Sequence, residues 1–210
     1  YVARTNQASW SDARSNTAGT GADSASNGQA YGISAYRASA RGGGYVWNIY
    51  RSFFFFDTSG ISGNVASATF KVYGFSMANG DLIAVKSTSD IISLGTADFT
   101  SIVGWNTTTD GSGGGDNESN VTKYSAEITS WSSGGYNDIA LNAQALADIR
   151  DDNTVYICLM NFDNDLKDIE PLNYTSHRSG LYYANHANAP YIDYTLAVAA
   201  DNATFFGANF

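Results

Sequence analysis

The chain has 210 residues, of which 43% are hydrophobic and 14% aromatic, enough to bury the core of one domain. Ser, Thr, Asn and Gly supply 81 residues, and 17 Asp stand against three Glu; both features favour strands and turns over helices. The net charge of −9 disfavours binding to nucleic acid or to an anionic membrane surface. No apolar run approaches the roughly 20 residues needed for membrane insertion.

Hydrophobic patterning divides the chain into three expected parts. Residues 1–30 are polar without a sustained apolar period, which predicts an extended N-terminal arm. Residues 31–198 hold the strand-like segments and predict a β-sandwich domain. Residues 199–210 form an aromatic C-terminal tail, which we expect to pack on this domain or on a neighbouring subunit through Phe205, Phe206 and Phe210.

Alternating or continuous apolar segments predict about nine strands, and one short helix is expected over residues 143–150, capped by Asn142. The pair Asn79-Gly80 indicates a hairpin turn between two of the strands. Residues 154–161 are apolar on both faces, which is typical of a central strand. The expected fold is all-β, an antiparallel, jelly-roll-like β-sandwich that buries the ribbon Phe53–Phe56, with strands near residues 31–36, 45–56, 66–75, 81–86, 121–128, 139–141, 154–161, 180–185 and 190–198.

Two central segments carry a family resemblance. Residues 51–61 read RSFFFFDTSGI, and residues 65–73 read VASATFKVY. A looser match closes the pattern with Ser176, Arg178 and Ser179, followed by residues 190–195, PYIDYT. Over about residues 31–198 the chain resembles the DNRLRE (disaggregatase-related) β-sandwich modules, and it is similar to jelly-roll domains of phage structural proteins and to carbohydrate-binding modules. The resemblance implies a non-catalytic structural or binding module.

An acidic loop late in the chain offers the best candidate metal site. Oxygen ligands clustered on one loop could hold Ca²⁺, the alternative being a solvated acidic loop. The candidate ligands are Asp163, Asp165, Asp168 and Glu170. The two histidines, His177 and His186, do not form a zinc motif, and the sequence contains no GxSxG nucleophile elbow.

Aromatic residues near the expected loops suggest a second kind of site. Tyrosine and tryptophan rings pack on sugar rings, so these residues form a candidate glycan-binding platform, the alternative being packing in the core or at an interface. The candidates are Trp105, Trp131, Tyr136, Tyr182 and Tyr183. Five N-x-S/T sequons could carry glycans in an exported protein, at Asn106, Asn117, Asn120, Asn173 and Asn202.

These features favour a non-catalytic structural subunit of an extracellular or viral surface assembly, such as a virion, a tail or a filament. In this hypothesis the chain has an adhesive or decorating role and forms a homo-oligomer or larger assembly through its terminal tails. The alternative is a glycan-binding module that recognises a polysaccharide or a host glycan, supported by calcium if the acidic loop binds it. A third hypothesis is a polysaccharide-active enzyme, for which the sequence offers many Asp but no diagnostic pairing.

Overall fold

The computed structural model describes residues 1–15, 18–23, 29–88, 93–106, 115–172 and 176–198. Two α-helices, α1 (Trp10–Ser15) and α2 (Ala143–Asp151), accompany a 3₁₀ helix, η2 (Thr96–Thr100), and a π-helix, η3 (Phe162–Leu166). Within these ranges ten strands form the body of the protein: β1 (Val2–Gln7), β2 (Gly21–Ala22), β3 (Gln29–Ser39), β4 (Tyr45–Asp57), β5 (Val65–Ala78), β6 (Leu82–Lys86), β7 (Tyr136–Ala140), β8 (Thr154–Asn161), β9 (Ser176–Tyr182) and β10 (Tyr191–Leu196).

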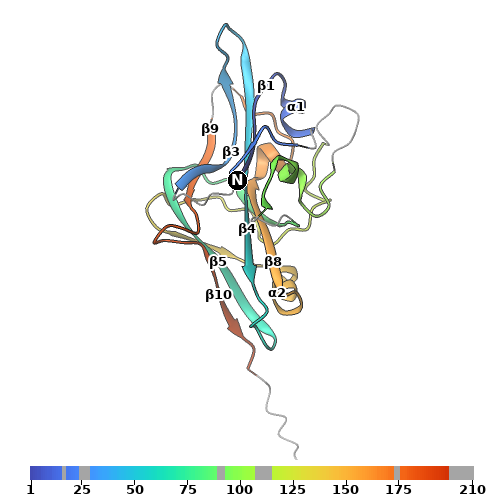
Figure 1. Ribbon diagram of the computed structural model, residues 1–210, viewed down its shortest axis with the longest axis vertical. Helices are drawn as coiled ribbons and strands as arrows, with labels where there is room; N and C mark the ends of the chain where they lie inside the picture. The colour runs from blue at the N-terminus through green and yellow to red at the C-terminus, as the bar shows by residue number, and fades with distance from the viewer. Residues whose placement is uncertain (16–17, 24–28, 89–92, 107–114, 173–175, 199–210) are drawn as a thin grey trace, which may run out of the picture.

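The strands pair antiparallel and form a sandwich-like, all-β fold, as the sequence predicts. One layer has the strand order β10-β5-β9-β3-β4-β1-β2, with β7 on β5, and the other layer contains β4, β8 and β6. Strand β4 therefore belongs to both layers and runs along the long axis of the molecule (Figure 1). Its residues up to Arg51 pair with β3 and β1, whereas residues 52–57 pair with β8.

Two hydrophobic cores lie on opposite faces of the β4-β8-β6 layer. The phenylalanine ribbon shows this directly, because Phe54 enters the first core and Phe53 enters the second. In the first core the Phe54 ring lies edge-on against Phe70 of β5, with 5.2 Å between centroids. Strand β8 is buried from both sides, so the prediction of a central strand is confirmed.

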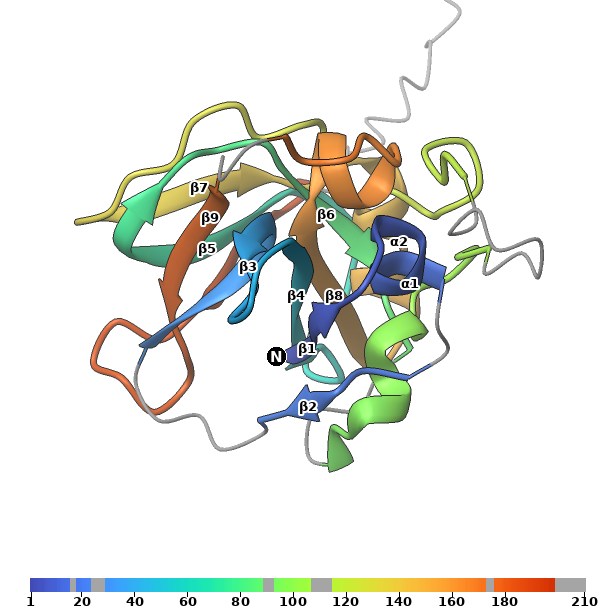
Figure 2. The ribbon, with the colours of Figure 1, turned by 90° about the horizontal axis from the view of Figure 1, so that it is seen from above.

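The second core is closed by segments that lie outside the main sheets. Trp10 and Ala13 of α1 and Phe99 of η2 pack there against Ile83 and Cys158. Figure 2 shows α1 and β5 on opposite sides of β8, so the molecule is three layers thick at this point. The third layer exists because β8 carries apolar side chains on both faces.

The N-terminal segment corrects the expectation of an extended arm over residues 1–30. Strand β1 pairs with β4 and with β2, and α1 buries Trp10 and Arg14. The segment shows no apolar period because its elements are short and each contributes only one or two core residues. The C-terminal tail, residues 199–210 with Phe205, Phe206 and Phe210, lies outside the described residues.

Two local predictions are also corrected, and one is confirmed. Residues 121–128 form only isolated bridges to β6, at Lys123 and Ile128, rather than a strand. The Asn79-Gly80 turn does not close a hairpin, because β6 pairs with β8 instead of β5. Helix α2 begins as predicted, with the Asn142 side chain accepting a hydrogen bond from the Ala145 amide at 3.1 Å.

The first core predicts the effect of removing a large side chain. Phe70 is fully buried and contacts the rings of Phe54 and Phe56, so Phe70→Ala leaves a cavity. We expect this change to lower the free energy of unfolding by about 3–5 kcal/mol in urea denaturation. The control, Phe55→Ala, removes a ring that is only partly buried and should cost clearly less. Equal losses for the two variants would contradict this description of the core.

Candidate functional site

Aromatic rings line the outer face of the sheet, on the side opposite the first core. Along β5 the side chains alternate: Phe70 and Val72 are buried, whereas Lys71 and Tyr73 face outward and are partly exposed. Strands β10, β7, β9 and β3 add further rings to this face. Together they form what we call the aromatic row: Tyr31, Tyr73, Phe75, Tyr136, Tyr182 and Tyr191.

The rings of the aromatic row touch one another in sequence from Tyr191 to Tyr31. Successive centroids are 5.1–5.8 Å apart, and most neighbouring pairs meet edge to face. Tyr31, Tyr136 and Tyr191 remain about 40% exposed. Because each ring is held by its neighbours, a ligand that packs on the row orders few side chains on binding.

An open pocket of about 470 Å³ lies at the Tyr31 end of the aromatic row. Tyr31 and Phe75 belong to the row and also line this pocket. The lining continues with Tyr36 and Tyr50, whose rings stack with centroids 6.4 Å apart, and with Tyr1, whose ring lies 5.7 Å from Tyr50. Strands β3, β4 and β5 supply four of these five rings, and Tyr1 directly precedes β1.

Arg178 of β9 is the one charged side chain that lines this pocket. Its register opposite Ser34 places it on the outer face, and its guanidinium carbon lies 3.7 Å from the centroid of the Tyr36 ring. Within the described ranges its side chain makes no hydrogen bond or ion pair, and its Nε is buried without an acceptor. By contrast, each of the four lysines pairs with a carboxylate.

The hydroxyl group of Tyr50 stays protonated in this pocket. Burial, reinforced by the neighbouring Tyr36, raises the pKa of Tyr50 to about 12, with Arg178 acting in the opposite direction. The Tyr50 hydroxyl is therefore a neutral hydrogen-bonding group at physiological pH. Positive charge in the lining side chains comes from Arg178 alone.

The five aromatic residues proposed from the sequence separate into two groups. Tyr136 and Tyr182 lie in the aromatic row. Trp131 is buried and donates from Nε1 to the Gly180 carbonyl at 3.0 Å, so it is a packing residue rather than a ligand contact.

The other two members of the proposed platform also face inward. Tyr183 lies over Phe54 and its hydroxyl contacts the Ser52 hydroxyl at 2.8 Å. Trp105 packs against the second core, 4.0 Å from the Arg51 guanidinium. The sequence prediction selected aromatic residues in or beside expected loops, and this criterion does not separate buried rings from exposed ones. It also missed the rings of the pocket, most of which lie within strands.

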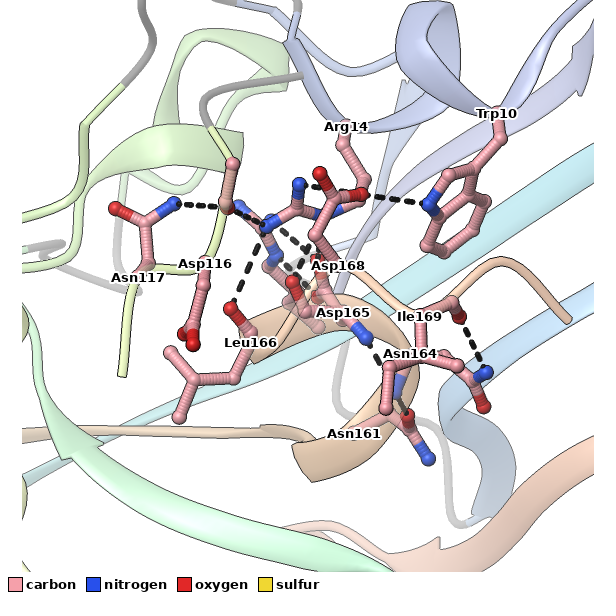
Figure 3. Close-up of polar contacts among 12 residues, drawn as sticks. Trp10, Arg14, Asp116, Asn117, Asn161, Asn164, Asp165, Leu166, Asp168 and Ile169 are labelled. Carbon is pink, nitrogen blue, oxygen red and sulfur yellow. Dashed lines mark hydrogen bonds and ion pairs between the residues drawn. The ribbon is translucent and has the colours of Figure 1, made fainter. Parts of the chain in front are cut away.

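The acidic loop forms a buried ion-pair cluster instead of an open ring of oxygen ligands. Asp165 is fully buried and accepts two hydrogen bonds from Arg51, from Nε and Nη2, both at 2.7 Å. Arg14 lies beside it and forms an ion pair with Asp168 at 2.8 Å, while Trp10 donates to the same Asp168 oxygen (Figure 3). Burial lowers the pKa of Arg14, and Asp165 and Asp168 oppose that shift.

The two remaining candidate calcium ligands lie outside the buried cluster. Asp163 is half-exposed and pairs with Lys167 at 3.4 Å, and Glu170 lies exposed on the surface. In the described part of the chain, no three His, Cys, Asp or Glu side chains come together as a metal site. The predicted calcium set is thus divided between arginine pairs, a lysine pair and solvent.

The sequons have different accessibilities. Asn117 is fully buried, and its Oδ1 accepts a hydrogen bond from the Asn106 amide at 2.8 Å, so this sequon cannot carry a glycan in the folded protein. Asn106 and Asn120 are exposed. Asn173 and Asn202 lie outside the described residues.

Comparison with known protein-family models and with curated proteins finds no match. The similarity to DNRLRE modules therefore remains a prediction that depends on the quoted segments. None of the helices in the described ranges has the length and apolar character required to cross a membrane.

The buried cluster predicts a large effect of a conservative substitution. Asp165→Asn removes the charge that compensates Arg51 and Arg14 in the interior, and we expect it to lower the free energy of unfolding by about 3–5 kcal/mol. The matched control is Asp163→Asn, whose pair is partly exposed and worth at most about 1 kcal/mol. Urea denaturation of both variants makes the comparison. A small effect at Asp165 would show that the cluster is not required for stability.

Proposed function

We propose that the chain is a non-catalytic saccharide-binding module that acts on an extracellular or virion surface. The observation that carries this proposal is the aromatic row, which extends over β10, β7, β5, β9 and β3 and ends at an aromatic-lined pocket. Sugar rings have apolar C–H faces that pack on tyrosine rings, and their hydroxyl groups bond to polar groups at the rim.

The geometry of the row suits an extended ligand better than a single small molecule. Tyr136 and Tyr191 at one end and Tyr31 at the other are exposed, so several sugar units of one chain could each contact a ring. Contacts of this kind are individually weak but act together along a polymer. The side chains that line the pocket include no carboxylate, and Asp138, which lies beside the row on β7, is paired with Lys71 at 2.8 Å. Most glycoside hydrolases perform acid–base chemistry with carboxylates, so this arrangement favours binding over hydrolysis.

The proposal predicts that binding depends on the exposed rings. We expect the double variant Tyr136→Ala/Tyr191→Ala to lower the affinity for a bound polysaccharide at least tenfold, because two stacking faces are lost. Affinity electrophoresis in gels containing dextran, alginate or pectin measures the change. Tyr45→Ala, which removes an exposed tyrosine elsewhere on β4, is the control. Failure of the unmodified protein to bind any polysaccharide in a broad panel would refute the proposal.

A second candidate role, self-association within a surface assembly, is favoured by the structure of β10. This strand pairs only with β5 in the described ranges, so its other edge presents free backbone groups. The exposed side chains Tyr194 and Leu196 lie at the end of the same strand, and the exposed Val198 follows it. An unpaired edge with exposed apolar side chains is a common template for strand addition.

Self-association predicts a change in mass when this edge is altered. We expect the full chain to form a dimer or larger species, and expect Leu196→Lys or deletion of residues 199–210 to shift it toward monomer, because charge on an edge strand opposes strand pairing. Size-exclusion chromatography with light scattering measures the mass. Tyr45→Lys places the same charge on a distant exposed position and should have no effect. A monomer for all four proteins would contradict this role.

A further inference from the structure

We propose that the pocket around Arg178 gives the protein a preference for acidic saccharides, binding the carboxylate of a uronic-acid-type unit while neighbouring units pack on the aromatic row. This inference rests on the proposed saccharide-binding function and specifies its ligand class. It assigns Arg178 as the residue that determines specificity, together with the rings of Tyr36 and Tyr50 that shape the pocket.

The first argument is the state of the Arg178 charge. Arg178 lies on β9 between β3 and β5, half-buried, with one face of its guanidinium on Tyr36. It has no carboxylate partner in the described part of the chain, although the protein has nine more negative than positive charges. A guanidinium that is partly desolvated and unpaired is a site for an anion, since binding supplies the missing partner.

The second argument is the composition of the pocket around that charge. None of the side chains lining it is acidic, and apart from Arg178 the lining is formed by tyrosine, phenylalanine and small residues. Ser34 and the Tyr50 hydroxyl are neutral hydrogen-bonding groups within the same lining. Apolar ring faces, hydroxyl groups and one charged side chain match a sugar ring that carries hydroxyls and one carboxylate.

The third argument is the position of the pocket relative to the row. Tyr31 and Phe75 line the pocket and are also the last two rings of the aromatic row. A polysaccharide lying along the row would therefore continue directly into the pocket. One charged contact at the end of several stacking contacts would then distinguish an acidic polymer from a neutral one, because discrimination needs only one group that differs between the two ligands.

The test compares oligogalacturonate with a neutral galacto-oligosaccharide of the same length by isothermal titration calorimetry. We expect the full chain to bind the acidic ligand at least tenfold more tightly, with an affinity that falls as the salt concentration rises. Arg178→Gln should abolish this preference by lowering the affinity for the acidic ligand to that for the neutral one. Arg178→Lys, which keeps the charge, should retain part of the preference.

Arg41→Gln is the matched control, because it removes the same charge from an exposed turn between β3 and β4 and should leave the preference intact. Thermal melting of each variant shows whether it is folded. Equal binding of the two ligands by the unmodified protein would overturn the inference while leaving the saccharide-binding function standing. Absence of binding to either ligand and to the wider panel would remove both. A preference that survives in Arg178→Gln would show that Arg178 is not its source.

Discussion

The buried ion pair between Arg51 and Asp165 lies at the residue where β4 passes from one layer to the other. Arg51 is the last residue of β4 that pairs with β1, and Ser52 is the first that pairs with β8. Asp165 lies in η3, directly after β8, so its two hydrogen bonds to Arg51 connect both layers at their junction. Isolated charges are costly to bury, and the cluster is tolerable because Arg14, Asp168 and Trp10 complete its hydrogen bonds.

Much of the fold follows from patterns that operate within one segment. Phe53 and Phe54 alternate between two cores, β8 is apolar on both faces, and Asn142 caps α2. Each of these features depends on residues that are close together in the sequence. The N-terminal segment could not be predicted in this way. Its core contacts come from single residues on short elements, and the value of burying Arg14 depends on carboxylates about 150 positions away.

The candidate site shows the same division between local and long-range information. Composition indicated an aromatic surface, and Tyr136 and Tyr182 were identified as candidates, but only the pairing of β7 and β9 with β5 brings their rings into one row. The sequence places Arg178 in the closing part of the family resemblance, but it gives no sign that this arginine lines a pocket. Its significance comes from what surrounds it: aromatic rings on one side and no carboxylate in the lining of the pocket.

The central place of β9 has a consequence for how the chain acquires its structure. This strand lies between β3 and β5, although residues that it pairs with, such as Ile33 and Gly74, precede their partners Ser179 and Leu181 by more than 100 positions. While the polypeptide emerges from the ribosome, the layer stays divided, with unsatisfied edges on β3 and β5, until residues 176–182 have been synthesised. Such long loop closures slow folding, so chaperone protection of the nascent chain would matter for this protein more than for one built of local hairpins.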